Sequence, residues 1–200
     1  MDQFRRIAIP AMFVGLALAL LYAVFSASSN GSNRDPVAKY AIGTIADLDT
    51  SGKGDLAPPA PFVDGEGGAV TLQDFPGQII LVNYWATWCG PCEREMPSLA
   101  ALETSKGSDK FKVVAISVDD PADRDYAKKR LGELSGGVLD FYAIGDGPEG
   151  WNVVYESGAG GGFPTTLIFG ADGQKIAKLE GEADWASYEA VALIDSLLKN

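Results

Sequence analysis

Apolar residues occur along this chain in two kinds of run, which predict different secondary structures. Residues 78–84, 111–118 and 138–144 are short, largely apolar and rich in β-branched side chains, as in strands buried on both faces of a sheet. Residues 91–104 place apolar side chains at near-helical spacing, and the charged segment 122–134 follows a helix-cap signal, Asp119-Asp120-Pro121. Strands and helices therefore alternate, which predicts parallel strands joined by helical crossovers.

Strand-like segments on either side of this region predict two hairpins. Residues 62–64 and 69–72 are joined by a glycine-rich turn, and 165–169 and 174–180 by Gly-Ala-Asp-Gly. The order of elements predicts an α/β sandwich with a mixed sheet, parallel in the middle and antiparallel at one edge.

The C-terminal segment predicts one more helix. Asp184 is a suitable N-cap, and Tyr188, Val191 and Ile194 recur at helical spacing up to Leu198. We expect these apolar side chains to form the buried face of the helix.

Residues 7–25 form a separate apolar run without a charged residue. As a helix the run would be about 28 Å long, close to the thickness of about 30 Å of a bilayer core. Arg5 and Arg6 precede it and residues 26–33 carry no charge, so the positive-inside rule keeps the N-terminus in the cytoplasm. We expect a transmembrane anchor; a cleaved signal peptide is the alternative, because residues 26–28 are small. Both interpretations place the rest of the chain in an oxidising compartment.

Composition divides the exported part into a linker and a folded domain. Residues 1–6 are the expected cytoplasmic N-terminus, and 26–59 the expected periplasmic linker, which can include a short helix between 37 and 48 that packs on the domain. The prolines of the low-complexity stretch 49–61 hold its backbone extended. We therefore expect the folded domain to cover residues 60–200.

Composition and charge exclude several classes of function. The chain is 46% hydrophobic and 22% charged, as is usual for globular proteins, and its formal net charge of −11 argues against binding nucleic acid. It has no histidine and two cysteines, which excludes histidine-based metal sites and Ser-His-Asp catalysis within the chain. Its chemistry must rest on thiols, carboxylates or backbone groups.

Both cysteines lie in one motif, Trp88-Cys89-Gly90-Pro91-Cys92, between a buried strand and the start of a helix. The free N–H groups and the dipole of that helix stabilise a thiolate, so the pKa of an exposed Cys89 should lie below the usual value of about 8.5. Cys89 is then the attacking nucleophile. Cys92, about one turn later, should be more buried and act as the resolving thiol.

Two other interpretations of the cysteine pair are a static disulfide and a metal site. A disulfide that closes so short a loop removes little chain entropy and adds little stability. A metal site would need further cysteine or histidine ligands, which the chain lacks. We therefore expect a redox-active disulfide and no bound metal.

The motif belongs to a larger pattern that resembles the TlpA/ResA group of membrane-anchored, thioredoxin-like thiol-disulfide oxidoreductases. The pattern includes the strand 80–85, the segments 93–97 and 163–166, and the hairpin 170–173; residues 184–187 are similar to the TlpA branch. The resemblance covers the chain from about residue 60 onward. It implies a thioredoxin-like three-layer sandwich with a central mixed β-sheet, an N-terminal hairpin extension, a central insertion at 121–150 and no cofactor.

The resemblance also implies a substrate groove beside the cysteines. Pro164 would be the cis-proline that lies opposite them, and Phe163 would offer backbone hydrogen bonds to an extended substrate. Gly90 and Pro91 would line the same groove. Trp88 would be a platform for partners, with a core aromatic as the alternative.

A carboxylate near the cysteines is the last element that the resemblance implies. Glu95 matches an acidic position that ResA-type proteins use near the active site, where it would relay protons. A solvated glutamate on a helix face is the alternative. Asn83 departs from thioredoxin, which has a buried aspartate at the matching place, so a proton relay would depend on Glu95 or water.

The resemblance implies a periplasmic reductant in the inner (cytoplasmic) membrane. Gly90-Pro91 is the thioredoxin dipeptide, associated with a potential of about −270 mV. Electrons would come from a membrane thiol transporter of the CcdA or DsbD type, and the client would be a copper-site protein or an apocytochrome with an oxidised cysteine pair. Residues 163–166 lack the acidic residue that DsbE-type proteins carry, which favours a role in assembling the copper site of cytochrome oxidase.

Other functions remain as alternatives to this reductase. One is a DsbE/CcmG-like reductase in cytochrome c maturation, and another is a non-catalytic, membrane-tethered module that presents a partner. A peroxiredoxin is disfavoured because Val82 and Ala86 occupy the positions where its proline and threonine would lie. The single anchored domain has no dimerisation stalk, so we expect a monomer and not an isomerase.

Overall fold

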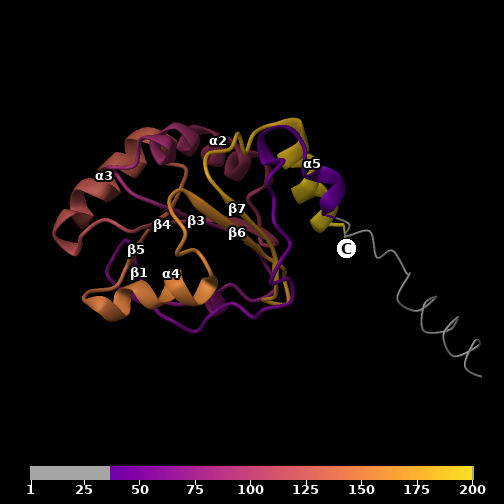
Figure 1. Ribbon diagram of the computed structural model, residues 1–200. Coiled ribbons are helices and arrows are strands. Elements are labelled where there is room, and N and C mark those ends of the chain that lie inside the picture. Colours follow the sequence, from indigo (N-terminus) through magenta and orange to yellow (C-terminus); the bar gives the residue numbers. More distant parts are fainter. Residues whose placement is uncertain (1–36, 200) are drawn as a thin grey trace, which may run out of the picture. The chain divides into compact units, whose positions relative to one another are not determined.

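A seven-stranded mixed sheet forms the centre of the computed structural model, which describes residues 37–199 (Figure 1). The strand order is β2-β1-β5-β4-β3-β6-β7. The strands are β1 Phe62–Asp64, β2 Ala69–Val70, β3 Ile79–Trp85, β4 Phe111–Ser117, β5 Phe141–Ile144, β6 Thr165–Phe169 and β7 Lys175–Glu180. The helices are α2 Gly90–Lys106, α3 Arg124–Ser135, α4 Asn152–Ser157 and α5 Tyr188–Leu197. The α/β sandwich with a mixed sheet is as predicted.

The sheet has antiparallel pairs at both edges, whereas the sequence predicted one such edge. β3, β4 and β5 are parallel neighbours, and β6 and β7 add the expected antiparallel hairpin next to β3. At the other edge β1 pairs antiparallel with β5, with Phe62 opposite Ile144, and carries β2 with it. The glycine-rich turn between β1 and β2 predicted that these two strands form a hairpin, but it could not predict that the hairpin joins the sheet next to β5.

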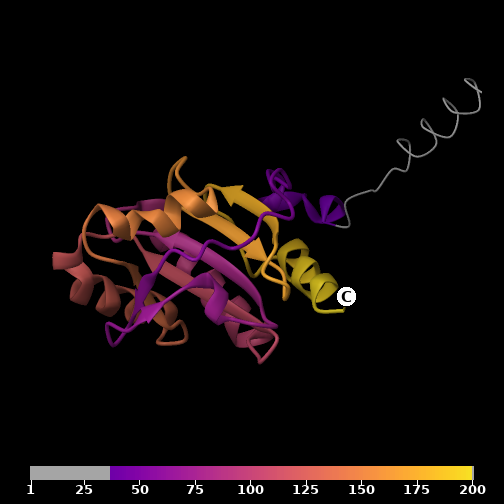
Figure 2. The same cartoon turned by 90° about the horizontal axis from the view of Figure 1, so that it is seen from below.

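Helices cover both faces of the sheet and bury β3 completely. Figures 1 and 2 show α2 and α3 on one face and α4 on the other. Every residue of β3 is buried, which explains its continuous apolar sequence. The Tyr84 hydroxyl donates a hydrogen bond of 2.9 Å to the carbonyl of Val153, which ties β3 to α4.

The last helix starts later than the sequence predicted. Ser187, not Asp184, caps α5 by accepting a hydrogen bond from the backbone N–H of Ala190. Its buried face contains Ala190 and Ile194, whereas Tyr188, which we expected on that face, is 86% exposed. Asp184 and Ser187 are both good capping residues, but the Asp184 carboxylate accepts a hydrogen bond from the Ala186 N–H in the turn before the helix.

Residues 37–59, which the sequence assigned to a linker with a possible short helix packed on the domain at 37–48, lie against the domain along this whole segment. They include two short 3₁₀ helices, Ala38–Tyr40 and Gly43–Ile45. Ile45 is fully buried, and Asp49 exchanges two backbone hydrogen bonds of 2.7 Å with Lys178 of β7. Ile45, Leu48 and Ala57 of this segment therefore contribute to the core.

The predicted anchor at 7–25 lies outside the described residues. Within residues 37–199, none of the helices combines the length and the hydrophobicity that crossing a bilayer requires.

Ile45 tests whether the segment before β1 stabilises the fold. Ile45→Ala removes a fully buried side chain and should lower the free energy of unfolding by about 2–4 kcal/mol. Ile42→Ala is the matched control, because Ile42 is 56% exposed and its loss should cost less than about 0.5 kcal/mol. Urea unfolding of both variants and the parent chain measures the difference. Equal, small losses would contradict the packing of this segment.

Candidate active site

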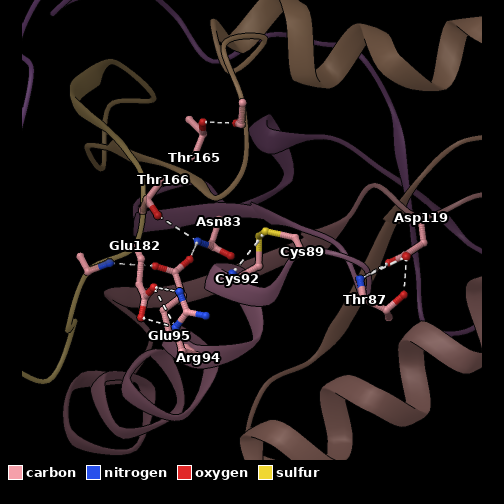
Figure 3. Close-up of a disulfide and its surroundings, with 12 residues drawn as sticks. Asn83, Thr87, Cys89, Cys92, Arg94, Glu95, Asp119, Thr165, Thr166 and Glu182 are labelled. Carbon is pink, nitrogen blue, oxygen red and sulfur yellow. Dashed lines mark hydrogen bonds and ion pairs between the residues drawn. A yellow bond between two sulfur atoms is a disulfide. The ribbon is translucent and has the colours of Figure 1, made fainter.

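Cys89 and Cys92 form a disulfide at the N-terminus of α2 (Figure 3). Cys89 is the N-cap residue, and its Sγ accepts a hydrogen bond of 3.3 Å from the backbone N–H of Cys92. Cys92 is fully buried, and Cys89, which we expected to be exposed, is only 6% exposed. The exposed residues beside it are Trp88, Gly90 and Pro91. A reacting sulfur must therefore approach Cys89 over these neighbours.

The start of α2 is suited to a thiolate at Cys89 once the disulfide is reduced. The free N–H groups and the positive end of the helix dipole favour a negative charge on a sulfur in this position. The Cys92 N–H already points at the Cys89 sulfur. The deeper Cys92 has less access to an incoming disulfide, so the geometry favours attack by Cys89.

A buried aspartate holds the loop that carries Trp88. The carboxylate of Asp119 is 4% exposed and accepts hydrogen bonds from the Thr87 backbone N–H at 3.1 Å and the Thr87 hydroxyl at 2.7 Å (Figure 3). The Ser117 hydroxyl donates a further bond of 2.7 Å. We expected Asp119 to contribute to a helix cap, but the cap comes from Asp120, which accepts a hydrogen bond from the Ala122 N–H in the 3₁₀ helix Pro121–Asp123 that precedes α3. Asp119 follows a different strand from Thr87, and their contact depends on the parallel pairing of β3 with β4.

Trp88 is a surface residue and is 66% exposed, whereas Trp85 in β3 is fully buried. The core alternative for Trp88 is therefore wrong. Its ring makes an edge contact with Phe163, with 6.1 Å between the centroids. Phe163 is joined to Pro164 by a cis peptide bond. No hydrogen bond among residues 37–199 uses the backbone N–H or C=O of Phe163, which leaves both groups available to a substrate.

Glu95 lies inside the protein and not on a solvated helix face. Its side chain is 2% exposed; Oε1 accepts a hydrogen bond of 2.6 Å from Asn83, and Oε2 accepts one of 3.2 Å from the Ala183 N–H. Asn83 also donates to the hydroxyl of Thr166, which lies opposite it on β6. Burial raises the pKa of Glu95 to about 7, although the hydrogen bonds from Asn83 and Ala183 oppose that shift. Glu95 can therefore exchange a proton near neutral pH.

An ion pair connects the central insertion to the first turn of α2. The guanidinium of Arg130 on α3 donates hydrogen bonds of 2.6 Å and 2.9 Å to the two carboxylate oxygens of Glu93. This bond from Arg130 lowers the pKa of Glu93. The sequence did not reveal the pair because the two residues lie on different helices.

No cluster of three or more potential metal ligands occurs among the described residues.

The chain is similar to proteins of one known family. The family model described as Redoxin matches residues 52–194. The thiol-disulfide oxidoreductase ResA of Bacillus thuringiensis (strain Al Hakam) is 30% identical over 140 residues, which cover 70% of this chain and 76% of that protein.

Solved structures share the fold. A DsbF homologue from Corynebacterium diphtheriae is 26% identical, with a TM-score of 0.59 over 75% of this chain and 92% of that one. The thioredoxin domain of a thiol-disulfide oxidoreductase from Bacteroides vulgatus has a TM-score of 0.60 at 23% identity, over 73% of this chain and 97% of that domain. The fold is therefore the thioredoxin-like α/β fold that the resemblance implied.

The raised pKa of Glu95 predicts a specific dependence of stability on pH. Because the pKa rises from 4.5 to about 7 on folding, the folded state binds more protons than the unfolded state between these values. Glu95 should therefore stabilise the fold fully below about pH 4.5, and this contribution should fall by about 3 kcal/mol as the pH rises through 7. The difference in unfolding free energy between the parent and Glu95→Gln should show that fall. A difference independent of pH would show that Glu95 does not titrate in this range.

Proposed function

This chain belongs to the Redoxin family and is a thiol-disulfide oxidoreductase, and we propose that it acts as a reductant of disulfides in client proteins. The observation that carries the proposal is the Cys89–Cys92 pair at the start of α2, with Gly90-Pro91 between the cysteines and the buried Glu95 one turn further along. The Gly-Pro dipeptide favours a reducing couple over an oxidising one. Phe163, whose backbone N–H and C=O form no hydrogen bond within residues 37–199, lies beside Trp88, where an extended client can bind.

The reaction is a dithiol/disulfide exchange that begins with both cysteines reduced. The Cys89 thiolate attacks one sulfur of the client disulfide, forms a mixed disulfide with it and releases the other client sulfur as a thiolate. The Cys92 thiol then loses its proton and attacks the Cys89 sulfur, which forms the disulfide seen in the structure and releases the second client thiolate. Two electrons pass from the cysteine pair to the client.

Glu95 is the group best placed to take part in the proton transfers. Its pKa of about 7 lets it hold or release a proton under ordinary conditions, and Asn83 fixes its position behind the cysteines. Asn83 carries no charge, so it orients the carboxyl group without competing for the proton. We propose that Glu95 accepts the proton of Cys92 during the second exchange.

The proposed setting is the periplasmic side of the inner membrane, with residues 7–25 as a single-pass anchor. This proposal is supported by the uncharged apolar run and by Arg5 and Arg6 before it. A reductant in an oxidising compartment needs electrons from the cytoplasm. We therefore propose a membrane thiol transporter of the CcdA or DsbD type as the donor, and a monomer as the working form.

The proposed client is a copper-site protein whose metal-binding cysteines have become oxidised, during assembly of cytochrome oxidase. Thr165 and Thr166, which follow the cis-proline, are buried, and neither supplies the carboxylate expected of a DsbE-type reductase. Their hydroxyls serve the protein itself: Thr165 donates to the carbonyl of Gly162, and Thr166 accepts from Asn83. Reduction of an apocytochrome during cytochrome c maturation is the alternative.

Single-cysteine variants test the direction and the order of the exchange. Cys92→Ser cannot complete the second step, so it should accumulate a mixed disulfide when its reduced form is mixed with a copper-site protein whose cysteine pair is oxidised. Cys89→Ser should form at least 10-fold less of that adduct, because Cys92 is buried. Non-reducing electrophoresis separates the adducts, and an oxidised apocytochrome tests the alternative client.

Two results would contradict the proposed function. Equal amounts of mixed disulfide in the two variants would contradict the roles of Cys89 as the attacking thiol and Cys92 as the resolving thiol. If the double variant Cys89→Ser/Cys92→Ser supported cytochrome oxidase assembly in cells as well as the parent chain does, the protein would instead be a non-catalytic module that presents a partner.

A further inference from the structure

Four aromatic rings form a continuous strip that begins beside the redox cysteines and ends on α4. Trp88 contacts Phe163 at 6.1 Å, Phe163 contacts Trp151 at 6.3 Å, and Trp151 stacks on Tyr155 at 5.9 Å, all between ring centroids. Trp88 and Phe163 belong to the substrate groove already described. Trp151 and Tyr155, which the sequence analysis did not single out, extend it. We call these four residues the aromatic strip.

The strip is accessible although its rings are large and apolar. Trp88 is 66% exposed and Tyr155 is 62% exposed, and the two rings between them are half-buried. Exposed aromatic residues joined to a reactive site are typical of a surface that binds a partner. Because the rings support one another by edge and stacking contacts, little side-chain freedom remains to be lost on binding.

The glycine-rich segment 158–162 makes room for the far end of the strip. A Cβ atom at Gly160 would lie 3.1 Å from Cδ1 of Tyr155, which is closer than side chains normally approach. A larger residue there would push Tyr155 away from its present position. Gly160 thus accommodates the ring of Tyr155.

The spacing of the rings matches an extended peptide. Neighbouring centroids lie 5.9–6.3 Å apart. Side chains at alternate positions of an extended strand lie about 6.6 Å apart on the same face. A client segment that pairs with the free backbone groups of Phe163 would therefore place alternate side chains over successive rings.

The charged residues of the segment that carries the far end of the strip are all acidic, and Lys175, whose Nζ reaches the Ser157 carbonyl at the end of α4, is largely buried and paired with Asp55. Between residues 145 and 162 the charged residues are Asp146, Glu149 and Glu156, and none is basic. Asp146 is paired with Arg124, while Glu149 and Glu156 are exposed and form no ion pair within the described residues. A segment with basic side chains beside its apolar ones fits this surface better than an acidic segment.

We propose that the aromatic strip selects clients by the segment next to their reactive cysteine. The strip binds an extended segment with apolar side chains two and four residues from that cysteine, and it favours basic residues between them. The inference rests on the proposed function, because it requires a client disulfide at Cys89. It adds Trp151 and Tyr155 as residues that determine specificity.

Peptides that carry a chromogenic disulfide test the proposal directly. Each peptide has one cysteine joined to thionitrobenzoate, with leucine or serine two and four residues from that cysteine, on either side of it. The reduced full chain attacks the peptide sulfur, releases coloured thionitrobenzoate, and then releases the peptide thiol as Cys89 and Cys92 form their disulfide. We expect the leucine peptides on one side of the cysteine to react about 5- to 10-fold faster than the serine peptides at limiting concentration.

Two tyrosine variants locate the source of this preference. Tyr155→Ser shortens the strip and should lower the leucine-to-serine rate ratio by about threefold. Tyr126→Ser is the matched control, because Tyr126 is 59% exposed on α3 and belongs to no ring contact of the strip. It should leave the ratio unchanged.

Charge is tested with lysine or glutamate between the two leucines. The lysine peptide should react faster in low salt, and the advantage should shrink in Glu149→Gln/Glu156→Gln and at high ionic strength. A faster glutamate peptide would overturn this part of the proposal.

The outcomes separate the proposal from the function on which it rests. Failure to release thionitrobenzoate from any peptide would contradict the reductase itself. Equal rates for leucine and serine peptides, or an equal loss for both in Tyr155→Ser, would overturn the aromatic strip alone. If the parent chain dimerised and Tyr155→Ser abolished the dimer, the strip would be the binding site of a second copy. If the parent chain bound phosphatidylcholine vesicles and Tyr155→Ser abolished that binding, the strip would be a lipid-binding surface. Either result would also overturn the proposal.

Discussion

The buried hydrogen bond between Asn83 and Glu95 joins the parts of the fold on which the redox site depends. Asn83 belongs to β3 and Glu95 to α2, while Thr166 of β6 and the backbone of Ala183 complete the network. A carboxyl group almost without exposure is costly unless it is protonated or hydrogen-bonded, so this network fixes the position of α2 on the sheet. It therefore fixes the cysteines at the start of α2, and the same burial gives Glu95 a pKa suited to proton transfer.

Elements from distant parts of the chain then shape the surface over the cysteines. Asp119, which follows β4, holds the loop of Trp88, and Arg130 on α3 pairs with Glu93 in the first turn of α2. The central insertion thus reaches the redox helix, which gives it a structural role beside the site. Trp151, just before α4, and Tyr155, within α4, extend the groove away from the cysteines.

Local patterns in the sequence predicted what is local in the structure. The strands β3 and β4 and the helix α2 were predicted because their apolar spacing reflects their own burial, and the redox motif because its residues are contiguous. The contacts of Asp119 with Thr87 and of Arg130 with Glu93 were not predicted, because they follow from strand order and helix packing. The second antiparallel edge and the cap at Ser187 were missed for the same reason, since several partners or caps suited the local sequence equally well.

The equilibrium reduction potential of the Cys89/Cys92 couple tests the central claim most directly. It can be measured at pH 7 by equilibrating the chain with dithiothreitol or glutathione buffers of known potential. A reductant supplied with electrons through the membrane requires a value near or below about −220 mV. A value near about −120 mV would make the protein an oxidant that introduces disulfides, and would contradict both the proposed electron donor and the proposed clients.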